Sequence, residues 1–180
     1  MGLAYAKEER WGEAIDQLEK ALAIKPDYAD ACVELGYIHH RLGQLVQAET
    51  AYRRALEFSP ALEGVYYNLG NLALGRGETE QAIELYEQTL QRNPDFVDAH
   101  NNMGQALERI GDWPGAVQHY RAAVERDPEL GGAWFNLGAA LEQHGPAVRV
   151  SITVFICAEE WVRLFTITGL SGIHLKLSLI

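Results

Sequence analysis

The chain has 180 residues, of which 25 are acidic and 15 are basic, so its formal net charge is −10. This acidic excess argues against binding to nucleic acid or to anionic membrane surfaces, because both need lysine and arginine facing phosphate groups. A hydrophobic fraction of 48% excludes a wholly disordered chain, and the length suits one domain or one continuous array.

Residues 1–28 predict one complete helix. The opening sequence MGLAYAKEERW lacks the apolar core of a signal peptide, and no run of eighteen apolar residues predicts a membrane span. We therefore expect a cytoplasmic protein. Only the last turns of a first helix are expected before residue 11, and a second helix should cover about residues 11–24.

The following residues repeat at a step of 34. The same or a similar residue type returns at this step in several columns, a regularity that indicates a solenoid or another repeat architecture. These columns hold Pro26, Pro60, Pro94 and Pro128; Gly2, Gly36, Gly70, Gly104 and Gly138; Gly43, Gly77, Gly111 and Gly145; Ala14, Ala48, Ala82 and Ala116; and Leu18, Tyr52, Tyr86 and Tyr120.

The spacing within each repeat predicts two helices. In unit 63–96, two groups of residues follow the i, i+3, i+4, i+7 rule for one helical face, and they are Tyr66, Leu69, Gly70 and Ala73, then Ala82, Leu85, Tyr86 and Thr89. Gly77 should end the first helix and Pro94 the second. Because Gly70 and Ala82 have little or no side chain, the two backbones can approach closely, and Tyr86 should fill the space toward the next unit.

Three units are complete, at residues 29–62, 63–96 and 97–130. Partial units occupy residues 1–28 and 131–146, and the helix at 131–144 lacks its partner. A helix pair of this size cannot bury its apolar stripe alone, so neighbouring units must stack. We therefore expect an all-α solenoid over residues 1–146. With partial units at both ends, it resembles a piece of a longer array of repeats.

The tail, residues 147–180, departs from the repeat. The segment 147–157, AVRVSITVFIC, is rich in β-branched residues and favours a strand. Residues 158–165 place Ala158, Trp161, Val162 and Phe165 on one helical face. We expect an irregular tail. It is either a cap that covers the last helix or foreign sequence from a frameshift or intron read-through, and the abrupt change of propensity favours the second.

The repeats resemble those of the tetratricopeptide family. The resemblance covers about residues 1–145 and rests on the 34-residue step, the closing prolines, the Leu-Gly pairs and the Ala-x3-Tyr spacing of Ala82 and Tyr86 and their equivalents. It implies a right-handed superhelical solenoid of antiparallel helix pairs, with a concave groove that binds other polypeptides. Catalysis is not a property of such repeats.

The family resemblance also locates the groove, which is lined by the face of each first helix opposite its packed face. Applied to this sequence, it gives eight candidate partner-binding residues. They are Tyr67, Asn68, Asn71, Asn101, Asn102, Gln105, Phe135 and Asn136. This surface is polar and nearly neutral, with Arg41 and Arg109 as its cations. The acidic chain as a whole favours a neutral or basic partner.

Three of these asparagines recur at the 34-residue step, namely Asn68, Asn102 and Asn136. Carboxamides stacked at regular intervals offer donors and acceptors to the backbone of an extended peptide. The row resembles the asparagine ladder of O-linked N-acetylglucosamine transferases and their bacterial relatives. An equally simple reading is that these asparagines only solvate the helices. Glu34 stands in the same column, so the ladder is shortened.

No catalytic, cofactor or metal site is predicted. Cys32 and Cys157 have no metal-type spacing, His119 and His144 stand alone, and His100 occupies a packing column. A clamp for a terminal carboxylate, as in chaperone-binding members of the family, is not expected because its lysine column holds Val33, Tyr67, Asn101 and Phe135. No motif of a nucleophilic enzyme or a phosphate loop is present.

The sequence therefore predicts a scaffold for protein–protein interaction that binds an extended segment and is not an enzyme. One alternative is that the array is the substrate-recognition arm of a larger enzyme such as a glycosyltransferase. Another is self-association through the open side left by the missing helix after residue 144.

Overall fold

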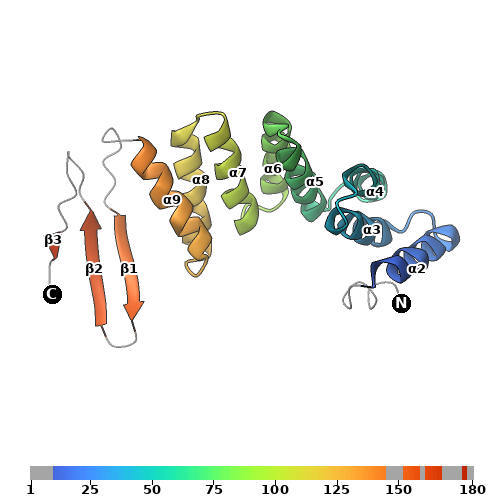
Figure 1. Ribbon diagram of the computed structural model, residues 1–180, viewed down its shortest axis with the longest axis horizontal. Coiled ribbons are helices and arrows are strands. Elements are labelled where there is room, and N and C mark those ends of the chain that lie inside the picture. Colours follow the sequence, from blue (N-terminus) through green and yellow to red (C-terminus); the bar gives the residue numbers. More distant parts are fainter. Residues whose placement is uncertain (1–9, 145–151, 159–160, 168–175, 178–180) are drawn as a thin grey trace.

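The computed structural model describes residues 10–144, 152–158, 161–167 and 176–177. The last turns of the first helix expected before residue 11 lie outside these residues. The helices of the described chain are α2 (Trp11–Ile24), α3 (Ala29–Arg41), α4 (Leu45–Phe58), α5 (Glu63–Arg76), α6 (Thr79–Arg92), α7 (Val97–Arg109), α8 (Trp113–Arg126) and α9 (Gly131–His144). They follow one another along the molecule from α2 to α9, as Figure 1 shows.

The predicted helical array is confirmed. Each complete unit holds two helices that pack against each other, α3 with α4, α5 with α6 and α7 with α8. The predicted helix at about 11–24 is α2, and the predicted helix at 131–144 is α9. Gly77, with φ of +81°, ends α5 in the left-handed conformation that glycine adopts without steric cost.

The closest packing within each unit is between a glycine and a tyrosine. The rings of Tyr52, Tyr86 and Tyr120 are fully buried and lie on Gly36, Gly70 and Gly104. A Cβ atom added at Gly70 would stand 2.6 Å from Cε1 of Tyr86. Tyr86 thus fills the space left by the glycine of its own unit, and it also joins a core that includes Met103 of the next unit.

A second column ties three of the four closing prolines to the helix that follows each of them. The Tyr66 hydroxyl donates to the Pro60 carbonyl at 3.2 Å, and the Trp134 indole donates to the Pro128 carbonyl at 3.0 Å. His100, which occupies the same column, has Nε2 3.0 Å from the Pro94 carbonyl oxygen. These bonds satisfy carbonyl groups at three turns between units and fix the start of the helices that follow, α5, α7 and α9.

The glycine column changes at the end of the array. Gly138 of α9 stands where Gly36, Gly70 and Gly104 each receive a tyrosine ring, yet a Cβ added at Gly138 would meet nothing within 4 Å among the described atoms. Gly138 and Ala139 are exposed. Within the described residues, no tyrosine ring packs on this glycine of α9, unlike the matching glycines of α3, α5 and α7.

The tail forms a three-stranded antiparallel sheet of β1 (Ile152–Ala158), β2 (Trp161–Ile167) and β3 (Lys176–Leu177). In Figure 1 the strands stand beyond α9, at the end of the array. The strand predicted within 147–157 is confirmed over its described part. The helical face expected at 158–165 is wrong for the described residues, because Ala158 ends β1 and Trp161–Phe165 lie in β2, paired in register from Ile152↔Ile167 to Ala158↔Trp161. The described part of the tail is thus regular.

Among the described residues, no helix combines the length and the apolar character that a membrane crossing requires.

Candidate functional site

A hydrogen-bonded network joins the first helices of the later units. Nδ2 of Asn102 on α7 donates to Oδ1 of Asn71 on α5 at 2.9 Å and to the Tyr67 hydroxyl at 3.2 Å. The Tyr86 hydroxyl donates to the same Oδ1 of Asn71 at 2.7 Å. Two of the predicted groove residues, Asn71 and Asn102, therefore connect α5, α6 and α7.

The network continues to the last helix. Nδ2 of Asn136 on α9 donates to Oδ1 of Asn101 at 3.0 Å, and Nδ2 of Asn101 donates to Oδ1 of Asn102 at 3.3 Å. Because these bonds pass from α5 to α7 to α9, the first helices lie side by side. Five of the eight predicted residues thus share one network with Tyr86, and they are Tyr67, Asn71, Asn101, Asn102 and Asn136.

The three asparagines of the predicted ladder are not equivalent. Both N–H groups of Asn102 are used, one on Asn71 and one on Tyr67. Asn136 keeps one N–H group and its carbonyl oxygen, while Asn68 has no hydrogen bond within the described part of the chain. The reason is the column one unit earlier, where Val33 and Tyr37 replace Tyr67 and Asn71 and leave Asn68 without the partners that Asn102 has.

The two predicted aromatic residues have different surroundings. The Tyr67 ring packs against Phe96, with centroids 5.0 Å apart, and against Tyr86 at 6.1 Å. Burial raises the pKa of the Tyr67 hydroxyl above its ordinary value. Phe135 on α9, by contrast, is 77% exposed. Tyr67 is therefore part of the scaffold, and Phe135 is an apolar side chain open to a partner.

The predicted cations of the groove are partly engaged. Nη1 of Arg109 donates to the Leu74 carbonyl at 2.7 Å, which ties α7 to α5. The Arg41 guanidinium donates to the Tyr37 hydroxyl at 2.9 Å and lies 5.9 Å from the Trp11 ring centroid. Gln105 is half-buried on α7.

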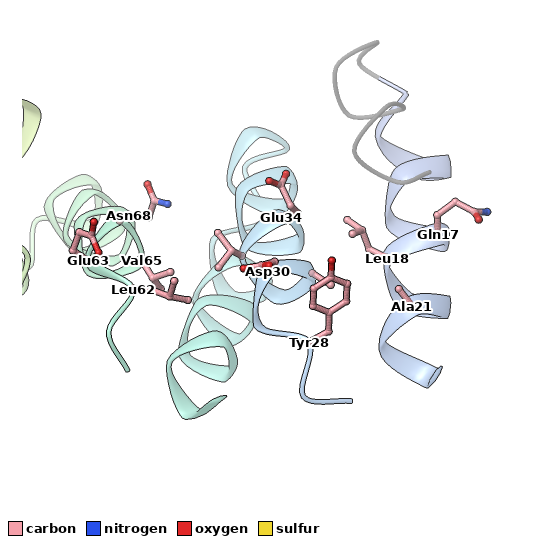
Figure 2. Close-up of a pocket in the computed structure, with 13 residues that line it drawn as sticks. Gln17, Leu18, Ala21, Tyr28, Asp30, Glu34, Leu62, Glu63, Val65 and Asn68 are labelled. Atoms are coloured by element: carbon pink, nitrogen blue, oxygen red, sulfur yellow. The ribbon is translucent and has the colours of Figure 1, made fainter. Parts of the chain in front are cut away.

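A cavity of about 660 Å³ lies at the N-terminal end of the surface formed by the first helices of the units. It lies among α2, α3 and α5, and Figure 2 shows Leu18 of α2 and Leu62 before α5 reaching toward α3 from opposite sides. Its lining includes Asn68, together with the carboxyl groups of Asp30, Glu34 and Glu63. The sequence places Asn68 and Glu34 in one column but does not predict the cavity, because the cavity depends on how three helices from three units meet.

The structure brings together two histidines that the sequence kept apart. Nδ1 of His100 lies 3.1 Å from Nδ1 of His119, so the prediction that His119 stands alone is wrong. A carbonyl oxygen only accepts, so the Nε2–H group of His100 donates to the Pro94 carbonyl. Nδ1 of His100 must then accept from His119 when both rings are neutral. Burial lowers the pKa of both rings, and burial together with the neighbouring His100 lowers that of His119 to about 4. In the residues that the structure describes, no group of three metal-ligating side chains accompanies this pair.

Several solved structures share this fold. Crystal structures of MamA superpose with a TM-score of 0.75 at 21% identity, over 81% of this chain and 85% of the other. YrrB, described as a TPR protein with an unusual peptide-binding site, gives a TM-score of 0.69 at 19% identity, over 79% of this chain and 74% of that one. PilF from Pseudomonas aeruginosa gives 0.74 at 21% identity, over 79% and 65%.

A curated relative is the Hsp70-Hsp90 organizing protein of Triticum aestivum, which is 36% identical over 62 residues. The match spans 34% of this chain and only 11% of the wheat protein. Family models for the tetratricopeptide repeat match residues 67–131 and 109–146, and models for the TPR repeat match residues 2–43 and 36–75. The chain therefore belongs to the tetratricopeptide repeat family, a family of scaffolds for protein–protein interaction.

Proposed function

We propose that the chain binds an extended peptide segment along the surface formed by the first helices α3, α5, α7 and α9. The observation that carries this proposal is the polar network from Tyr67 to Asn136, which joins three of these helices into one surface. A network of this kind fixes the spacing of the open groups beside it, so a peptide would find them already in position.

The open groups suit a peptide backbone. Asn68 offers its whole carboxamide and Asn136 offers one N–H group and one carbonyl oxygen, so each can bond both N–H and C=O groups of a partner. Phe135 adds an exposed apolar contact on α9. We expect a neutral or basic partner because the chain carries a net charge of −10.

The same surface would serve a larger enzyme as the arm that selects a protein substrate. The recurrence of asparagine at 68, 102 and 136, as in transferases of O-linked N-acetylglucosamine, favours this second candidate. A catalytic domain in the sequence beyond residue 180 would distinguish it from a free-standing scaffold.

Single substitutions test the surface with a peptide captured from a displayed random dodecapeptide library. Asn68→Ala and Asn136→Ala should each weaken binding several-fold, since each removes one or two hydrogen bonds of about 0.5–1.5 kcal/mol. Asn102→Ala should in addition lower the free energy of unfolding by about 1 kcal/mol, because it removes the bonds to Asn71 and Tyr67. Calorimetric titration and urea unfolding measure the two quantities.

The matched control is Gln47→Ala, which removes an exposed carboxamide on α4, outside the first helices. It should change neither the affinity for the peptide nor the free energy of unfolding. If the captured peptide bound all three asparagine variants as tightly as the unchanged chain, the proposed surface would be the wrong one.

A further inference from the structure

The cavity at the N-terminal end of the surface combines an apolar wall with acidic groups. Leu18 of α2, Val33 of α3 and Val65 of α5 supply apolar lining. Asp30 and Glu34 come from α3, and Glu63 comes from the first turn of α5. Figure 2 shows Asp30 and Glu34 on α3, between Asn68 of α5 and Tyr28, while Glu63 lies on the other side of Asn68.

These carboxyl groups have no cationic partner in the described chain. The ion pairs of residues 10–144 involve Glu13, Glu49 and Asp95, and none of them involves Asp30, Glu34 or Glu63. Glu34 is half-buried, and its pKa is raised by burial first and then by the nearby Asp30. A carboxylate held away from water beside a second carboxylate is stabilised by any cation that enters.

We propose that this cavity receives the side chain of a lysine or arginine from the bound peptide segment. The proposal rests on the proposed function and adds a specificity site to it. The aliphatic stem of the basic residue packs on the apolar wall, as such stems do on apolar surface. Its charged end meets the acidic lining on α3, where Asp30 and Glu34 stand one helical turn apart and supply carboxylate acceptors for an ammonium or guanidinium group.

One residue of the cavity lining, Tyr28, already contacts an ammonium group. Nζ of Lys25 lies 5.0 Å from the ring centroid of Tyr28, and Tyr28 lines the cavity. A cation at this distance from an aromatic face is attracted by the ring. Lys25 itself does not line the cavity, so the interior remains acidic and is suited to a basic side chain from outside the chain.

A thermodynamic cycle tests the pairing. A dodecapeptide captured from the random library and containing lysine is compared with the same peptide carrying norleucine, which keeps the stem and removes the charge. For the unchanged chain, norleucine should weaken binding about 10-fold, as expected for a hydrogen-bonded charge. For Glu34→Gln the same replacement should weaken binding less than about 3-fold. Glu80→Gln, an equal charge change at an exposed position of α6, should keep the full 10-fold effect.

The outcomes separate this inference from the function on which it rests. If the library yields binders that depend on Asn68 and Asn136 but show no enrichment of lysine or arginine, the cavity assignment is overturned and the groove stands. An equal norleucine effect in Glu34→Gln and in the unchanged chain overturns the assignment as well. Failure to capture any peptide contradicts the proposed function and, with it, the cavity assignment.

Discussion

Replacing Gly70 by alanine should lower the free energy of unfolding by about 2 kcal/mol. The added Cβ would stand 2.6 Å from Cε1 and 2.8 Å from Cδ1 of the fully buried Tyr86, so the ring or the α5 backbone must move. Overpacking of this kind costs about 1–3 kcal/mol and outweighs the 0.5–1 kcal/mol by which alanine favours a helix over glycine. Urea unfolding followed by circular dichroism measures the change.

The control is a glycine-to-alanine substitution at Gly138, which occupies the position of Gly70 two units later in the repeat. Gly138→Ala adds a Cβ that meets nothing within 4 Å among the described atoms, so it should raise stability by about 0.5–1 kcal/mol. Gly75→Ala, on the same helix as Gly70, has equally open surroundings and should act in the same direction. Equal effects of Gly70→Ala and Gly138→Ala would show that the glycine–tyrosine contact does not hold the two helices of a unit together.

Acidification should lower the free energy of unfolding by about 2 kcal/mol through protonation of the histidine pair His100 and His119. Because the folded-state pKa of His119 is lowered to about 4, the folded chain favours the neutral ring. Its stabilising contribution is therefore complete above the unfolded pKa of about 6.5 and is lost as the pH falls from there toward 4. His100 contributes in the same direction, since a proton on its Nδ1 would face the N–H group of His119.

Other groups titrate in this range, so the comparison must isolate the histidine. Asp112 raises the pKa of His119 and so works against the effect of burial. Arg126 lowers the pKa of His100, and Asp95 raises it. His119→Phe removes the titrating ring and should flatten the dependence of unfolding free energy on pH between 7 and 4.5. His39→Phe, whose ring faces Gln44 away from the pair, should leave the slope unchanged. If the His119→Phe variant kept the pH dependence of the unchanged chain, protonation of His119 would not be the cause of the lost stability.

The helical array could be predicted from the sequence because its signals are local and repeated. Gly70 and Tyr86 are 16 positions apart in one unit, and the same pair returns as Gly36 with Tyr52 and as Gly104 with Tyr120. A contact that repeats three times leaves a column in the sequence. The tail has no such repetition. There the apolar spacing at 158–165 suggested a helix, whereas Trp161–Phe165 pair with β1 as part of a strand.

The site could be predicted only as a surface. The sequence placed Asn68, Asn102 and Asn136 in one column, but their partners come from neighbouring units and differ. Asn102 therefore uses both N–H groups, while the half-buried Asn68 has no hydrogen bond in the described chain. The pairing of His100 with His119 depends likewise on how α7 and α8 pack side by side. Contacts that occur once, between units or between helices, leave no periodic signal to read.

The most direct test of the account is a crystal structure of the chain with a peptide captured from the library. We expect the peptide to lie extended across α3, α5, α7 and α9, with backbone hydrogen bonds to Asn68 and Asn136. A peptide bound only to the second helices α4, α6 and α8, or folded into a helix against the open face of α9 at Gly138, would contradict the account.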